Sequence, residues 1–128
     1  MEIFSIIILA LSGLLLVFVG AMRLSNPIQT YAKNSGIKLD QDVDLLNEIR
    51  GVSALQLCAG LIAWTGIFFP PFRTTSFAVA ALVFVGFLMG RLISISADGK
   101  PNKQIMQGII FELVLGAANI FGLISSLS

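Results

Sequence analysis

The sequence has no histidine and only one cysteine, Cys58, among its 128 residues. The absence of histidine excludes haem ligation through His and the common zinc sites that need an imidazole ligand. A lone cysteine cannot form an intrachain disulfide or a Cys-x-x-Cys redox pair. Cys58 lies among apolar residues, where a cysteine behaves as a small hydrophobic side chain rather than as a reactive thiol. We therefore expect no metal site and no cofactor.

Charged residues are also scarce: they make up 12% of the chain, compared with about 25% in an ordinary soluble domain. Hydrophobic residues make up 56%, and the mean hydropathy is +0.93. This composition is typical of a membrane protein, so the lipid bilayer is the expected environment. The net charge of +1 and the lack of a basic face argue against nucleic acid as a partner. Composition does not change along the chain, so residues 1–128 are interpreted as a single transmembrane domain.

Four long apolar stretches cover residues 3–24, 47–69, 75–96 and 105–126. Each has the roughly 20 residues that an α-helix needs to cross a hydrocarbon core of about 30 Å. The period-2 alternation of a membrane β-strand is absent. The predicted fold class is therefore all-α, an integral membrane four-helix bundle. The first stretch has Glu2 and no Lys or Arg before it, so we expect a retained span rather than a signal peptide.

Seven of the eight Lys and Arg residues lie in or next to the connections 24–47 and 97–104, and Arg73 alone lies on the opposite side. The positive-inside rule therefore places both connections in the cytoplasm and both termini outside. In the first connection, Pro27 suits the first position of a helix and Gly36 suits the residue just past its end. We expect a short cytoplasmic helix over about 27–35 that lies on the membrane interface.

One cation and one anion interrupt the last two apolar stretches. Arg91 precedes Asp98 by seven residues, and Glu112 follows Gln104 by eight. At a rise of 1.5 Å per residue, both lie roughly 10–12 Å from the connecting turn, which places them at the same depth in an antiparallel hairpin. An unpaired charge near the centre of a membrane helix costs about 2.5–3.5 kcal/mol. We therefore expect Arg91 and Glu112 to meet inside the bundle.

Other polar residues share helix faces with this pair. Gln104, Glu112 and Asn119 follow helical spacing along one face, and Glu48 shares a face with Gln56 in the second apolar stretch. The sequence predicts a polar ligand-binding cavity in the cytoplasmic half of the bundle, lined by Glu48, Gln56, Arg91, Asp98, Glu112 and Asn119. Its predicted cytoplasmic rim consists of Asn47, Arg50, Ser94 and Gln104. Small residues predict close helix packing at Gly86, Gly90, Gly108 and Gly116.

Three stretches resemble a known family: LLNEIRG at 45–51, GRLIS followed by DGKP at 90–94 and 98–101, and the helix around Glu112. They are similar to the small bacterial membrane proteins grouped as domain of unknown function 4345. The four-helix layout is similar, more distantly, to the DoxX-like group, which includes quinone-linked redox accessory proteins. The resemblance implies a multi-pass protein of the bacterial inner (cytoplasmic) membrane and gives no activity.

Four interpretations of the charged cluster stay open. The first is a module that binds or transports a lipid or small amphipathic ligand, with Arg91 holding a polar or anionic head. The second is an accessory or assembly subunit of a membrane complex, and the third is an internal salt-bridge network that only fixes the fold. An enzyme ranks last, because no histidine, activated nucleophile or metal-ligand motif accompanies the carboxylates. A homo-oligomer is compatible with each of these.

Overall fold

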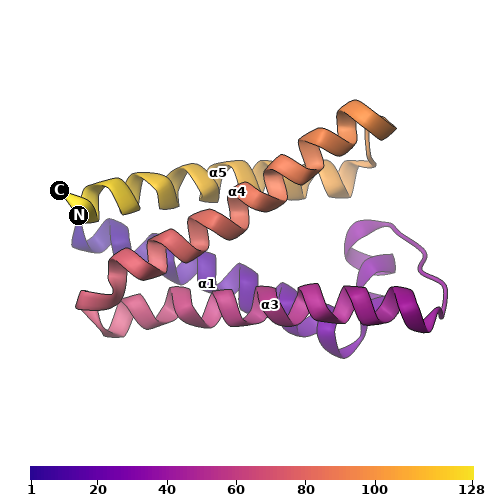
Figure 1. The fold of residues 1–128 in the computed structure, drawn as a ribbon, viewed down its shortest axis with the longest axis horizontal. Coiled ribbons are helices and arrows are strands. Elements are labelled where there is room, and N and C mark those ends of the chain that lie inside the picture. Colours follow the sequence, from indigo (N-terminus) through magenta and orange to yellow (C-terminus); the bar gives the residue numbers. More distant parts are fainter.

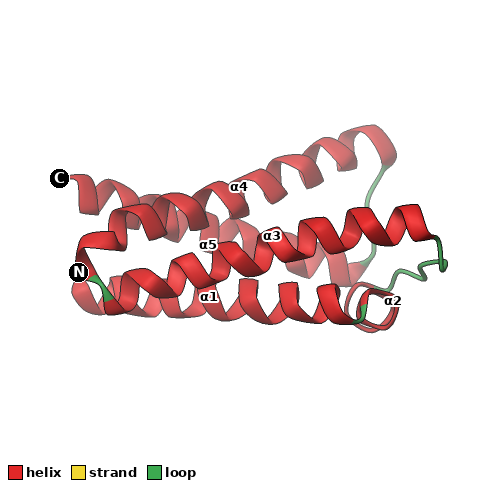
Figure 2. Ribbon diagram, turned by 60° about the horizontal axis from the view of Figure 1, so that its bottom comes forward, coloured by secondary structure: helices red, strands yellow, loops and turns green.

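The computed structural model describes residues 1–128 as an all-α protein. Four long helices, α1 (Glu2–Ser25), α3 (Val43–Phe68), α4 (Arg73–Asp98) and α5 (Lys103–Leu127), run side by side (Figure 1). Each is long and apolar enough to cross a membrane. All the connections lie at the two ends of the bundle (Figure 2). The predicted fold class is confirmed, and every predicted span falls within four residues of a helix boundary at each end.

Polar caps explain why two of the helices begin earlier than predicted. The side chain of Asp42 accepts hydrogen bonds from the backbone N–H groups of Asp44 (3.0 Å) and Leu45 (3.5 Å), which starts α3 at Val43. Asn102 does the same for α5 through the N–H of Ile105 at 2.9 Å. Hydrophobicity alone marks only the part of a helix inside the lipid, so it misses these capped polar turns.

The predicted short helix between the first two spans is present as α2 (Pro27–Thr30) followed by a π-helical turn, η1 (Tyr31–Ser35). It ends at Gly36, which has a φ of 66°, a left-handed conformation that glycine adopts without steric cost. The segment is fastened to α5: Asn102 donates a hydrogen bond to the carbonyl of Ser35 (2.8 Å), and Gln104 donates one to the carbonyl of Lys33 (3.1 Å). It therefore lies over the end of the bundle that carries the α4–α5 turn.

Glycine allows α1 and α3 to pack closely, but not at the predicted positions. A Cβ atom at Gly60 would lie 2.8 Å from the backbone nitrogen of Val17, so α1 and α3 touch through their backbones. By contrast, a Cβ at Gly86, Gly90 or Gly108 would meet nothing within 4 Å, and Gly116 makes only ordinary contacts. Within one chain, no neighbouring helix packs against the first three, because α4 and α5 leave open space at those positions.

The open space has a structural cause. A short 3-10 turn, η2 (Pro70–Phe72), joins α3 to α4 at the end of the bundle that holds the chain termini. From there α4 runs obliquely, crossing α5 and moving away from α3 toward the α4–α5 turn (Figure 1). The buried core, around Phe77, Phe84, Leu9 and Leu16, therefore lies toward the terminal end and the middle of the bundle. The other end is looser.

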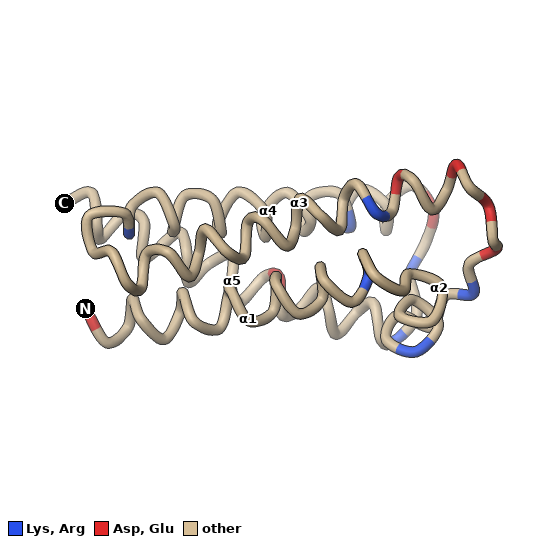
Figure 3. Tube along the Cα trace, turned by 90° about the horizontal axis from the view of Figure 1, so that it is seen from below, with Lys and Arg blue, Asp and Glu red and all other residues tan.

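Seven of the eight Lys and Arg residues lie at or near the looser end, and Figure 3 shows the blue segments gathered there. We call it the basic end. Arg73 lies at the terminal end, where it pairs with Glu2 at 3.6 Å and donates a hydrogen bond to the carbonyl of Gly66 at 2.9 Å. The charge asymmetry expected from the sequence is therefore a real feature of the folded molecule.

Candidate functional site

The predicted pairing of Arg91 with Glu112 is present. The α4–α5 hairpin brings the Nε of Arg91 within 2.8 Å of Oε1 and 3.0 Å of Oε2 of Glu112. The Glu112 side chain is buried, and that of Arg91 is about three-tenths exposed, at 29%. Because both charges lie within apolar helices, each lowers the cost of placing the other there.

Arg91 engages the carboxylate through only one of its three nitrogens. The hydrogen bond to Glu112 comes from Nε, and neither terminal nitrogen of the guanidinium donates a hydrogen bond to the protein. A guanidinium carries five N–H donors in a planar fork. Four of them, on the two terminal nitrogens, therefore stay free to bind an anion in a bidentate manner.

A second arginine, Arg23, belongs to the same cluster. It lies in the last turn of α1, with its guanidinium carbon 4.7 Å from the ring centre of Tyr31, a cation–π contact. Arg23 forms no ion pair and donates no hydrogen bond within the protein. The cluster therefore holds two guanidinium groups and one carboxylate, Glu112, which pairs with Arg91 and not with Arg23.

Arg23 is not among the site residues predicted from the sequence. Its charge contributes there only to the prediction of membrane orientation. A signal was nevertheless available, because the buried residues of α1 repeat at helical spacing through Leu9, Ser12, Leu16 and Gly20. Arg23 follows Gly20 by three positions and continues that inward face. The inward face of α1 therefore consists of small and apolar residues until it ends in the cation Arg23. A cation on such a face indicates a candidate site.

Three cavities surround the two arginines, and both Arg23 and Arg91 line each of them. Their volumes are about 100, 140 and 340 Å³. The smallest also touches Gln56 and Glu112, while the 140 Å³ cavity lies against Thr30, Asn34, Ser35 and Gln104, under the α2–η1 segment. The cluster therefore lies among three small neighbouring cavities of mixed polar and apolar lining at the basic end of the bundle, and we call them together the arginine chamber.

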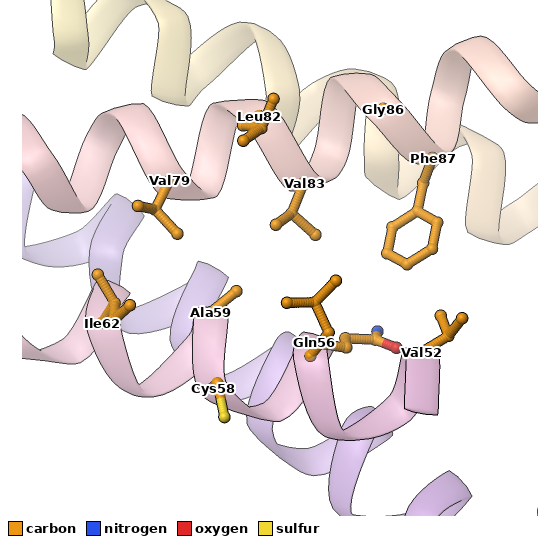
Figure 4. Close-up of a pocket in the computed structure, with 11 residues that line it drawn as sticks. Val52, Gln56, Cys58, Ala59, Ile62, Val79, Leu82, Val83, Gly86 and Phe87 are labelled. Atoms are coloured by element: carbon orange, nitrogen blue, oxygen red, sulfur yellow. The ribbon is translucent and has the colours of Figure 1, made fainter. Parts of the chain in front are cut away.

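An apolar groove leads to the arginine chamber from the side. It has a volume of about 380 Å³ and lies between α3 and α4, where the two helices diverge. Figure 4 shows Val79, Val83 and Phe87 projecting from α4 toward α3, while the sulfur of Cys58 points away. Val52, Gly86 and Phe87 line both this groove and the 340 Å³ cavity, so the two spaces are neighbours.

The structure brings only part of the predicted cavity together. Gln56, Arg91 and Glu112 line the same space. Glu48 and Asp98 do not: both are exposed and line none of the four spaces described above. Both lie near the ends of α3 and α4, where the divergence of those helices leaves no neighbour to cover them. Their predicted membership of the cavity is corrected accordingly.

Asn119 also lies outside the arginine chamber. Its amide nitrogen donates hydrogen bonds to Oγ of Ser12 at 2.9 Å and to the carbonyl of Leu115 at 2.8 Å. It is fully buried and lies about two turns beyond Glu112 on α5. Asn119 therefore cross-links α5 to α1 within the packed core, and it is a structural residue here.

The predicted rim residues have separate roles. Arg50 donates a hydrogen bond to the carbonyl of Leu24, which ties α3 to the end of α1. Asn47 is exposed, and Ser94 donates to Oδ2 of Asp98 at 3.0 Å on the surface of α4. Gln104 and Ser94 line cavities of the arginine chamber, as predicted for a rim, whereas Asn47 and Arg50 do not.

The four candidate spans and the charged chamber between them define a small multi-pass membrane protein. A model of the family described as Domain of unknown function (DUF4345) matches residues 4–123, and the chain belongs to this family. The resemblance to that family drawn from the NEIRG and DGKP stretches is thereby confirmed. No curated protein and no solved structure matches the chain.

Proposed function

We propose that this protein binds a small anionic amphipath, without catalysing a reaction on it. In this proposal the anionic head lies in the arginine chamber between Arg23 and Arg91, and the hydrocarbon chain lies in the α3–α4 groove. We further propose that the basic end faces the cytoplasm and that the ligand comes from the adjoining leaflet of a bacterial inner membrane.

One observation carries the proposal: two guanidinium groups line the same cavities, and only one of them, that of Arg91, has a carboxylate partner. With all three groups ionised, the cluster has a net positive charge inside a membrane protein. An unbalanced cation there is costly, and such residues usually face a binding site or pathway. An anionic head would balance the charge and use the free N–H donors of Arg91.

The apolar groove supports an amphipathic ligand over an inorganic anion. Nine of its eleven lining residues are hydrophobic, and its volume of about 380 Å³ falls within the range of ordinary ligand pockets, about 300–1,000 Å³. All of its lining residues come from α3 and α4, so it lies between these two helices. A chain lying there would leave its head beside Gly86 and Phe87, next to the arginine chamber.

The runner-up is an accessory subunit whose charges only fix helix register. The direct ion pair between Arg91 and Glu112 favours it. It accounts for those two residues, but it gives no role to Arg23 or to the groove. A relationship to the DoxX-like accessory proteins stays a prediction.

Titration with tetradecanoate, followed by native mass spectrometry in a non-ionic detergent, tests the proposal. Arg23→Gln removes a cation that has no carboxylate partner, so the variant should fold. Because a hydrogen bond to a charged group contributes about 1.5–3 kcal/mol, affinity should fall at least about tenfold. Lys100→Gln removes the same charge from the exposed α4–α5 turn and should bind like the parent protein. Equal binding by all three proteins, or binding by none, would overturn the proposal.

A further inference from the structure

Gln56 lies where the apolar groove meets the arginine chamber. It is on α3, is 7% exposed, and lines both the groove and the 100 Å³ cavity that Arg23, Arg91 and Glu112 also line. Figure 4 shows its amide in the gap between α3 and α4, opposite Phe87. Any ligand whose head is in the chamber and whose chain is in the groove would pass this amide.

The amide of Gln56 has no partner within the protein. Its Oε1 is fully buried without a hydrogen bond, and its nitrogen donates none. Leaving a buried polar group unsatisfied costs about 1–3 kcal/mol. Ser53, by comparison, donates a hydrogen bond to the carbonyl of Ile49 at 2.6 Å. The Asn119 side chain also has an unpartnered oxygen, Oδ1, but its amide nitrogen makes two hydrogen bonds, whereas the Gln56 amide makes none at either atom.

No donor of the protein is hydrogen-bonded to Gln56, although Arg23 and Arg91 line the same 100 Å³ cavity. The groove around it is formed by aliphatic and aromatic side chains such as Val52, Ala59 and Phe87. Neither the terminal N–H groups of Arg91 nor those of Arg23 donate a hydrogen bond to this amide, so the cavity lies between the amide and the two guanidinium groups. The complementary group must therefore come from a molecule that enters the site.

Resting on the proposed function, we infer that the ligand carries a hydroxyl group between its anionic head and its chain, and that Gln56 recognises this hydroxyl. The amide marks the boundary between the polar and apolar halves of the site, so the hydroxyl belongs within the first few carbons after the anion. A hydroxyl both donates and accepts hydrogen bonds, so it matches the amide in either orientation of its side chain. The substrate class is a single-chain hydroxylated anionic amphipath.

A matched set of probes tests this inference: tetradecanoate, 2-hydroxytetradecanoate and 3-hydroxytetradecanoate. They share charge and chain length and differ only in the hydroxyl. Their dissociation constants are measured by native mass spectrometry for the parent protein, for Gln56→Leu and for Gln107→Leu. Gln107 is exposed on α5 and lines neither the groove nor the arginine chamber, so the same substitution there is the control.

We expect the parent protein and the Gln107→Leu control to prefer at least one hydroxy acid over tetradecanoate by about two- to tenfold, the range that a net hydrogen bond of about 0.5–1.5 kcal/mol gives. Gln56→Leu should lose that preference and bind tetradecanoate at least as well as the parent does. The inference is overturned if the parent binds all three acids equally in an Arg23-dependent manner, or if Gln56→Leu keeps the preference. If no acid binds the parent, the proposed function itself fails.

Discussion

Arg23 and Arg91 line the same three cavities, although they come from different halves of the chain, and the carboxylate of Glu112 pairs with Arg91 alone. Arg91 and Arg23 therefore differ in their contacts, a difference that the sequence alone does not reveal. The Nε of Arg91 completes an ion pair that holds α4 to α5. Arg23 and the terminal nitrogens of Arg91 make no such contact, and in the proposed function they bind the anionic head of the ligand.

The ion pair gives a first prediction about stability. Arg91→Gln leaves the buried carboxylate of Glu112 without its partner, which should lower the free energy of unfolding by about 3 kcal/mol, the usual cost of breaking a buried pair. The double change Arg91→Gln with Glu112→Gln removes both charges and should recover at least half of that loss. Thermal unfolding of the two single variants and the double variant in one detergent measures the coupling. Strictly additive losses would contradict the pair.

Two glycines on different helices give a matched test of the packing. A Cβ at Gly60 would lie 2.8 Å from the backbone nitrogen of Val17, so Gly60→Ala should push α1 from α3 and destabilise the protein by about 1–3 kcal/mol. A Cβ at Gly90 would meet nothing within 4 Å. Gly90→Ala should therefore be neutral or stabilise by about 0.5–1 kcal/mol, since alanine is the better helix former. Melting temperatures that fall equally for both variants would contradict this packing.

The sequence predicts the four helices well, because each carries a run of apolar residues as long as a bilayer is thick. It also predicts that Arg91 and Glu112 meet, since a short turn fixes their depths. It does not give the neighbours of Gly86, Gly90 and Glu48, because these depend on the angle between α3 and α4. That angle is a tertiary property, and helical spacing within one segment carries no information about it.

Orientation is a third prediction, and it follows from the charge asymmetry between the two ends. In a Cys58→Ser background, a single cysteine at Lys100 should react with a membrane-impermeant maleimide only after the cells are opened. A single cysteine at Ser128 should react in intact cells, because it lies at the opposite end of the bundle. The reverse labelling pattern would show that the basic end faces outward.

The last prediction concerns the groove. It tests where the hydrocarbon chain of the ligand binds, independently of the binding of its anionic head. Gly86 lines both the groove and the 340 Å³ cavity, and a Cβ there would meet nothing within 4 Å, so Gly86→Phe should fold while filling the passage between them. Tetradecanoate binding should fall about tenfold or more in native mass spectrometry, because the buried chain loses apolar contact worth about 0.8 kcal/mol per methylene. Ile110→Phe adds the same ring on the exposed face of α5, outside the groove, and should bind like the parent. If Gly86→Phe and Ile110→Phe bind tetradecanoate equally well, the chain lies elsewhere and the α3–α4 groove is not its site.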